Sequence, residues 1–228
     1  MTYLCLNSEK ATNDNNYKLD ESINGTYKLV SFTFTNNIFN VNDTNNTIYW
    51  NENNTDLESS LTNGFYDAND FESHLSSVMN SDGAGTIAVS INENTRKITI
   101  TNTLNMYFKF GSNTLNSARK LLGFNESDGT ASTSIESDNC IDLNTYKNIW
   151  IDFEENDNRM LSGIDYFNTS LYISGLGNFG EIVRYINRDN FDQYIKLKNT
   201  KKLTIKFHDN NNNSIDLNSN YEIILEKC

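Results

Sequence analysis

The sequence predicts a mainly β fold, with one or two jelly-roll-like or β-sandwich-like domains and a short helix or two inserted in the N-terminal half. Short segments of alternating apolar and polar residues, rich in Ile, Val, Thr, Tyr and Phe, recur along the chain. Turn-forming clusters of Asn, Asp, Ser and Gly separate these segments. Regularly spaced short strands with such turns between them are typical of sandwiches and jelly rolls.

The first half contains clear strand patterns. Residues 25–34 have near-alternating apolar positions, and the change of phase around Val30 indicates a bulge or a bend. A hairpin is predicted from residues 86–91 and 97–101, because both segments alternate and a turn sequence lies between them. The further strands predicted in this half are 38–41, 47–50 and 107–110.

One helix is predicted near residues 68–80. Either Asp67 or Asn69 can cap its N-terminus through a side-chain oxygen. A second, shorter helical segment is predicted at 114–122. The apolar residues that recur at helical spacing in the first segment are Phe71, Leu75, Val78 and Met79.

The second half is predicted to be all-β and to form a domain of its own. We expect a flexible N-terminal arm at 1–22, a β-rich domain at 23–124, a linker at 125–139 and a β-sandwich-like domain at 140–228. Two separate β domains and one continuous sandwich with a helical insert both fit the pattern. The strands predicted in the second half are 148–153, 170–173, 181–186, 203–207 and 221–225.

The composition excludes several classes of protein. The 228 residues include 30 acidic and 18 Lys or Arg residues, a net charge of −12, which argues against direct contact with nucleic acid. No apolar segment is long enough for a membrane span, and residues 1–9 lack the basic start of a signal peptide. Three widely spaced cysteines, Cys5, Cys140 and Cys228, fit a reducing compartment better than a disulfide scaffold.

Two segments resemble ligand-binding loops, but neither meets the full requirement. Residues 175–180 match the glycine spacing of a dinucleotide site, yet a strand pattern follows them where a helix is needed. Residues 209–220 supply oxygen ligands at alternate positions like a calcium loop, yet they have Ser214 in place of the glycine and Asn220 in place of the bidentate Glu. We therefore expect a flexible loop in the first segment and an Asn-rich turn in the second.

No residue is predicted to be catalytic, to bind a cofactor or to hold a metal. His74 and His208 are the only histidines, and no local pattern places either beside a cysteine and an orienting group. Lysines at 196–206 form the only basic segment, which either contacts an acidic neighbour or is a solvated strand edge. Trp50 and Trp150 either pack in a core, which we favour, or offer stacking surfaces. The candidate partner-contact residues are Lys196, Lys198, Lys201, Lys202, Trp50 and Trp150.

Several segments, taken in order, carry a resemblance to a known family. The chain resembles the minor capsid proteins of large icosahedral double-stranded DNA viruses and of the related virophages and Polinton-like elements. The resemblance extends over about residues 24–225. Order and spacing carry it, through residues 25–29, 36–41, 61–79, 94–100, 108–110, 121–124, 171–173, 181–186, 203–209 and 215–218.

This resemblance implies jelly-roll-like domains, no catalysis and a place in a viral shell. The implied partners are the major capsid protein, other minor capsid proteins and further copies of the same chain. The implied location is the virion, with assembly in the host cytoplasm. The predicted function is therefore that of a non-enzymatic minor capsid protein that cements or links capsomers.

Two alternatives remain open at this point. A penton protein at the capsid vertices is also a β-sandwich protein of this size. A glycan-binding or host-attachment module would use tryptophan and tyrosine side chains as stacking platforms. An enzyme needs a concave site with converging titratable groups, and the sequence shows no such set.

Overall fold

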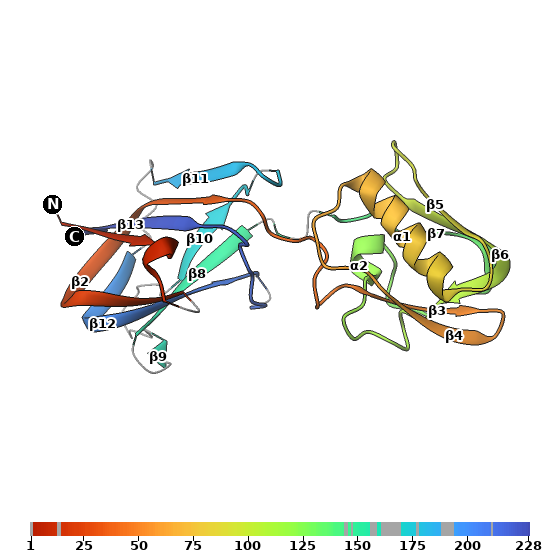
Figure 1. Ribbon diagram of the computed structural model, residues 1–228, viewed down its shortest axis with the longest axis horizontal. Helices are drawn as coiled ribbons and strands as arrows, with labels where there is room; N and C mark the ends of the chain where they lie inside the picture. Colours follow the sequence, from red (N-terminus) through yellow and green to blue (C-terminus); the bar gives the residue numbers. More distant parts are fainter. Residues whose placement is uncertain are drawn as a thin grey trace. The chain divides into compact units, whose positions relative to one another are not determined.

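The computed structural model describes residues 2–12, 15–143, 146, 148–155, 159–160, 170–176, 178–187, 194–210 and 212–228. Within these residues the chain is mainly β, so the predicted fold class is confirmed (Figure 1). The helical elements are η1 (Ser8–Lys10), α1 (Ala68–Asp82) and α2 (Arg119–Leu122). The strands are β1 (Tyr3–Asn7), β2 (Asn16–Thr35), β3 (Thr47–Glu52), β4 (Thr55–Ser60), β5 (Ile87–Ile91), β6 (Ile98–Phe108), β7 (Ser132–Glu136), β8 (Asn148–Glu155), β9 (Arg159–Met160), β10 (Ser170–Ser174), β11 (Ile182–Ile186), β12 (Tyr194–His208) and β13 (Tyr221–Lys227).

The chain divides into two compact units. The first, which we call the sandwich unit, comprises Met1–Ile38 and Tyr146–Cys228. The second, which we call the inserted unit, comprises Phe39–Thr145. The prediction of two consecutive domains with a boundary near residues 125–139 is therefore wrong. Local patterns could not show that the first and last strands of the chain share one sheet.

The sandwich unit is built from one sheet of antiparallel strands in the order β1-β13-β2-β12-β8-β10, in which β11 also pairs with β2 and β9 with β8. β2 is long enough to pair with β12 along its first part and with β13 and β11 along its last part. The register between β13 and β2 skips Val30, which confirms the predicted bulge. Bulges increase the twist of a strand, and this one lies where β2 passes from one set of neighbours to the other.

Alternation along the strands forms the core of the sandwich unit. Ile149, Ile151 and Phe153 of β8 are buried in this core, and Trp150 and Asp152 lie on the other face of the strand, where Trp150 is half-buried and Asp152 is buried. The buried hydroxyl of Tyr17 donates a hydrogen bond of 3.0 Å to the hydroxyl of Tyr221. Burial raises the pKa of both phenols, so both remain neutral hydrogen-bonding groups inside this core.

The inserted unit contains a second sheet with the order β4-β3-β6-β5, in which β7 also pairs with β6. The hairpin predicted in this region is confirmed as β5 and β6. The predicted helix is confirmed as α1, and the Asp67 side chain caps it by accepting hydrogen bonds from two backbone N–H groups. Phe71, Leu75 and Met79 are the buried residues of α1.

The segment predicted to be an N-terminal arm belongs to the sheet. β1 pairs with β13 over five residues, and Leu6 is only 1% exposed in the core. β2 already begins at Asn16. The prediction of a loosely held arm at 1–22 is wrong. Most residues of the segment are polar, but the few apolar ones, Leu4 and Leu6, pack against the core and hold the segment in the sheet.

Two further predictions fail in the inserted unit. The expected linker at 125–139 contains β7, which pairs with β6 and packs Ile135 against the core of this unit. The expected strand at 38–41 is not formed, since only Val41 makes an isolated β-bridge, to Gly64. In both places the local composition does not indicate whether the segment pairs with strands that are distant in the sequence.

Candidate functional site

The predicted contact lysines lie on β12 of the sandwich unit. Lys198, Lys201 and Lys202 are exposed and Lys196 is half-buried. β12 pairs with β2 from Tyr194 to Thr204, but it pairs with β8 only from Leu203 to His208. Within the described part of the chain, the stretch with Lys196, Lys198, Lys201 and Lys202 therefore pairs with β2 alone, which is compatible with the predicted strand edge.

A bulge brings two of these lysines to the surface in succession. The register of β12 against β2 shifts on both sides of Thr200, and that side chain is buried. Lys201 and Lys202 are both exposed, and Lys202 lies directly opposite Lys18 of β2. Like charges that face each other across two strands repel, so this surface is suited to an acidic neighbour.

The two tryptophans have different environments. Trp50 on β3 is 0% exposed in the core of the inserted unit, and its Nε1–H donates to Ser59 Oγ at 3.0 Å. The structure therefore contradicts a contact role for Trp50. Trp150 on the outward side of β8 is half-buried, and its Nε1–H donates to Asn210 Oδ1 at 2.9 Å.

Trp150 is the centre of a row of rings across three strands. Tyr172 of β10 and His208 of β12 are its cross-strand partners on either side. The ring centroids are 4.8 Å from Tyr172, with an interplanar angle of 54°, and 6.4 Å from His208. His208 Nε2 also lies 2.9 Å from Asp152 Oδ2, so a histidine–carboxylate pair borders the aromatic row. This face of the sheet, with its row of aromatic rings, can contact a ligand or a neighbouring chain. The His208–Asp152 pair lies on the same face.

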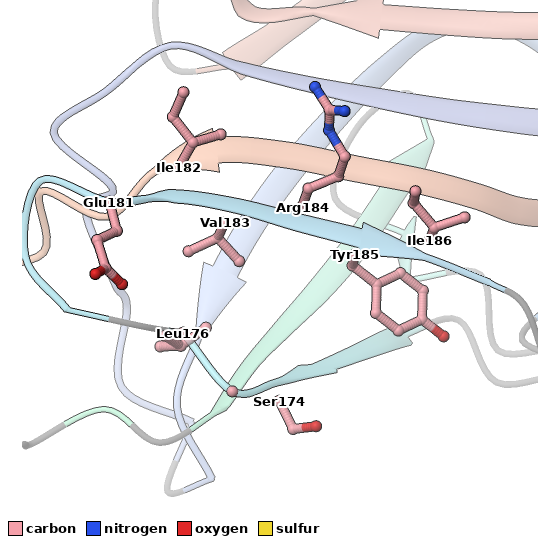
Figure 2. Close-up of a pocket in the computed structure, with 9 residues that line it drawn as sticks. Ser174, Leu176, Glu181, Ile182, Val183, Arg184, Tyr185 and Ile186 are labelled. Carbon is pink, nitrogen blue, oxygen red and sulfur yellow. The ribbon is translucent and has the colours of Figure 1, made fainter.

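A second surface lies along β11. It is formed by the strand itself and by the end of β10, which together line an open pocket of about 310 Å³ (Figure 2). Val183 is buried and faces the pocket together with Leu176, whereas Arg184 lies on the opposite side of the strand. Ile182 and Ile186 are 70% and 42% exposed.

The pocket is closed at one end by a tight loop. Both Gly175 and Gly180 have positive φ values, 73° and 78°, which other residues rarely adopt. The Glu181 carboxylate accepts hydrogen bonds from the backbone N–H and the side-chain amide of Asn178, and these bonds hold its pKa below the ordinary value. The Gly180 N–H donates to Asn36 O at 2.8 Å. Strand β11 follows, so this segment is not a dinucleotide site; Gly177 lies outside the described residues.

The other ligand-like loop is a turn. Asp209 accepts hydrogen bonds from the backbone N–H and the side-chain amide of Asn213, at 2.8 and 2.9 Å. Asn212 adopts a φ of 66°, as expected for Asn in a tight turn. Asn211 lies outside the described residues. In the part of the chain that the structure describes, no three His, Cys, Asp or Glu side chains are grouped to hold a metal ion.

The exposed isoleucines of β11 are not among the contact residues predicted from the sequence. The signal was present, because residues 182, 183, 185 and 186 are all apolar or aromatic. Such a strand places apolar side chains on both of its faces, whichever face covers the core. The pattern alone predicts only another strand of the sandwich.

The chain was compared with known proteins in three ways. No family model matches it, and no curated protein matches it. Among solved structures, the fold is similar to that of the mavirus penton protein, with a TM-score of 0.52 and 12% sequence identity. The match covers 100% of both chains. The chain therefore shares the penton protein's fold over its whole length.

No helix among the residues described in the structure is both long and apolar enough to cross a membrane. The three cysteines are free and exposed.

Proposed function

We propose that this chain is a non-enzymatic structural protein of a viral capsid and that it occupies the vertices as a penton protein. The full-length likeness to the mavirus penton protein carries this proposal. The likeness includes both units, whereas a sandwich alone is shared by proteins with many functions. The order of motifs in the sequence supports a capsid role independently.

The charge distribution fits a shell protein that does not contact the genome. The inserted unit contains 14 acidic and 5 Lys or Arg residues, a net charge of −9 out of −12 for the chain. An acidic surface is repelled by nucleic acid and is suited to basic surfaces on other shell proteins. The partners we propose are the major capsid protein, minor capsid proteins and further copies of this chain.

The three free cysteines fit assembly in a reducing compartment. We therefore propose assembly in the host cytoplasm and a final location in the virion.

A map of the purified particle tests this proposal. We expect the density of both units at the five-fold vertices and a fixed stoichiometry to the major shell protein. Density between capsomers, away from the vertices, would contradict the vertex position and favour the minor capsid role that links capsomers. Absence of the chain from particles would refute the capsid role.

A glycan-binding function is the second candidate, and the half-exposed pair of Trp150 and Tyr172 favours it. Aromatic faces next to polar groups are suited to stacking on sugar rings. Titration of the chain with a panel of glycans tests this function. Binding that is lost in Trp150→Ala and kept in Trp50→Phe, which changes only the buried tryptophan, would support it.

A further inference from the structure

The sandwich unit contains four neighbouring strands that end in two open edges. β11 pairs with β2, β2 with β13, and β13 with β1. Figure 1 shows β11 alongside β2, and the chain end that carries β1 alongside β13. Within the described part of the chain, no strand pairs with the outer side of β11 or of β1. An unprotected strand edge is a template for pairing with another chain.

The backbone of β11 presents its hydrogen-bonding groups to the open edge at alternate residues. Asn36 N–H donates to Glu181 O at 2.9 Å, and Asn187 N–H donates to Val30 O at 3.0 Å. Residues bonded to one neighbour alternate along an antiparallel strand. The backbone groups of Ile182, Arg184 and Ile186 therefore point away from β2.

β1 shows the same alternation along its backbone. Lys227 N–H donates to Thr2 O at 2.9 Å, so residues 2, 4 and 6 are the ones that bond to β13. The backbone groups of Tyr3, Cys5 and Asn7 point to the outer edge. The outer side of each strand thus carries backbone groups at alternate residues, with the spacing of a β-ladder.

The side chains at these edges lack the usual protection against pairing. β1 has no charged residue, and Arg184 is the only one in β11. Six large hydrophobic side chains are exposed in the described part of the chain, and four of them lie at the two edges or in the loop before β11. They are Tyr3, Phe179, Ile182 and Ile186. Natural edge strands are normally blunted by charges or by proline, and this chain has no proline.

We propose that copies of this chain join head to tail by pairing β1 of one copy with β11 of the next. This inference deepens the proposed function and rests on it, because it assigns the contact by which copies would meet in the shell. A second copy is the occupant we favour, since the chain itself supplies both edges with equal length. Each is a strand of five residues.

Direction and register agree with this pairing. The strands β11, β2, β13 and β1 alternate in direction, so β1 and β11 of one copy run in opposite directions. Rotation about an axis parallel to the strands keeps these directions in the next copy. β1 of one copy is therefore antiparallel to β11 of the next. Pairing all five residues brings Cys5 opposite Arg184, Asn7 opposite Ile182 and Tyr3 opposite Ile186. The exposed side chains of Tyr3 and Cys5 then lie beside the exposed side chains of Ile186 and Arg184. Leu4 and Leu6 lie on the same face as Tyr185 and Val183.

The register predicts a disulfide that tests the contact without removing any core residue. Arg184→Cys places a thiol opposite Cys5 of the neighbouring copy, where paired Cα atoms are about 5.5 Å apart. The variant is made with Cys140→Ser and Cys228→Ser, so that Cys5 is the only native thiol. We expect covalent dimers and higher oligomers on a non-reducing gel after mild oxidation.

Matched controls define the outcomes of this experiment. Cys5→Ser in the same background abolishes the crosslink, and Thr33→Cys in place of Arg184→Cys gives none, because Thr33 is one strand farther from the edge. Crosslinking through Ile182→Cys or Ile186→Cys instead supports the same contact in a shifted register. Failure at all three positions, or dimers formed through Cys5 alone, would overturn the proposed pairing.

A second measurement weakens the contact directly. Ile182→Lys with Ile186→Lys adds charges at two exposed positions, so the fold is kept, as circular dichroism will show. We expect at least about a tenfold rise in the dissociation constant for self-association by sedimentation. Leu115→Lys, at a site 73% exposed in the inserted unit, is the matched control and leaves association unchanged. Equal association of both variants and the wild type would refute the inference.

These outcomes separate the inference from the proposed function. If the chain is found at the vertices of particles but the β1–β11 crosslink does not form, only the pairing is refuted. Crosslinked chain in solution that is absent from particles refutes the capsid role and leaves the pairing intact.

Discussion

A buried carboxylate organises one end of the inserted unit, and its replacement gives a sharp prediction. Glu52 on β3 is 4% exposed. Its Oε2 accepts from Ala84 N–H at 2.6 Å, and its Oε1 accepts from Gly85 N–H at 3.1 Å and from Asn102 Nδ2 at 2.6 Å. Glu52 therefore ties the loop after α1 to β3 and β6.

Glu52→Gln keeps the shape of the side chain but removes its charge and turns one acceptor into a donor. At least one of the three N–H donors then loses its partner in a buried place. A hydrogen bond to a charged group contributes about 1.5–3 kcal/mol, and an unsatisfied buried donor costs a similar amount. We expect the free energy of unfolding of the inserted unit to fall by about 2–4 kcal/mol.

Urea unfolding followed by tryptophan fluorescence measures this change. The two tryptophans lie one in each unit, so Trp150→Phe leaves Trp50 as a reporter of the inserted unit alone. Glu58→Gln, on the exposed surface of β4, is the matched control and should change stability by less than about 0.5 kcal/mol. A loss below 0.5 kcal/mol for Glu52→Gln would refute the organising role.

The same pair of proteins gives a pH dependence. Burial raises the pKa of Glu52, but the hydrogen bonds from Asn102, Ala84 and Gly85 outweigh it and hold the pKa below the ordinary value. A carboxyl group whose pKa is lowered by folding contributes stability that is fully present above its unfolded pKa, about 4.3. That contribution disappears as the pH falls through the lower folded value. The stability difference between wild type and Glu52→Gln should therefore be constant near neutral pH and shrink in acid.

Three further changes test other parts of the structure. Leu75→Ala opens a cavity in the core beneath α1, and we expect a loss of about 2–5 kcal/mol in urea unfolding of the inserted unit. Asp67→Ala removes the cap that accepts two hydrogen bonds, so about 1 kcal/mol is lost and Asp67→Asn restores most of it. Tyr221→Phe leaves the buried hydroxyl of Tyr17 without its acceptor, and we expect the sandwich unit to lose about 1–2 kcal/mol, measured through Trp150 fluorescence.

Features that depend on a few neighbouring residues were predicted correctly. The helix capped by Asp67, the hairpin of β5 and β6, and the bulge at Val30 all follow from local spacing. Capping, turn formation and side-chain alternation act within about ten residues, so the sequence contains the whole cause of each.

The candidate site was predicted only in part. Lys198, Lys201 and Lys202 of β12 are exposed and Lys196 is half-buried, but the bulge that brings Lys201 and Lys202 to the surface together depends on pairing with β2. Trp50 and Trp150 have similar strand contexts in the sequence, and only the packing shows that one is buried and the other half-exposed. The open edge at β11 was not foreseen, because a strand becomes an edge only through the places of its neighbours.

The sequence by itself determined the fold class, most of the strand segments and the acidic balance of this protein, since alternation and charge are properties of the chain. Only the tertiary structure decided that Tyr3–Asn7 joins β13 and that residues 39–145 interrupt the sandwich. The physical reason is that any strand has hydrogen-bonding groups on both edges and can pair with many others. The choice among these partners depends on which arrangement buries all of the apolar faces at once.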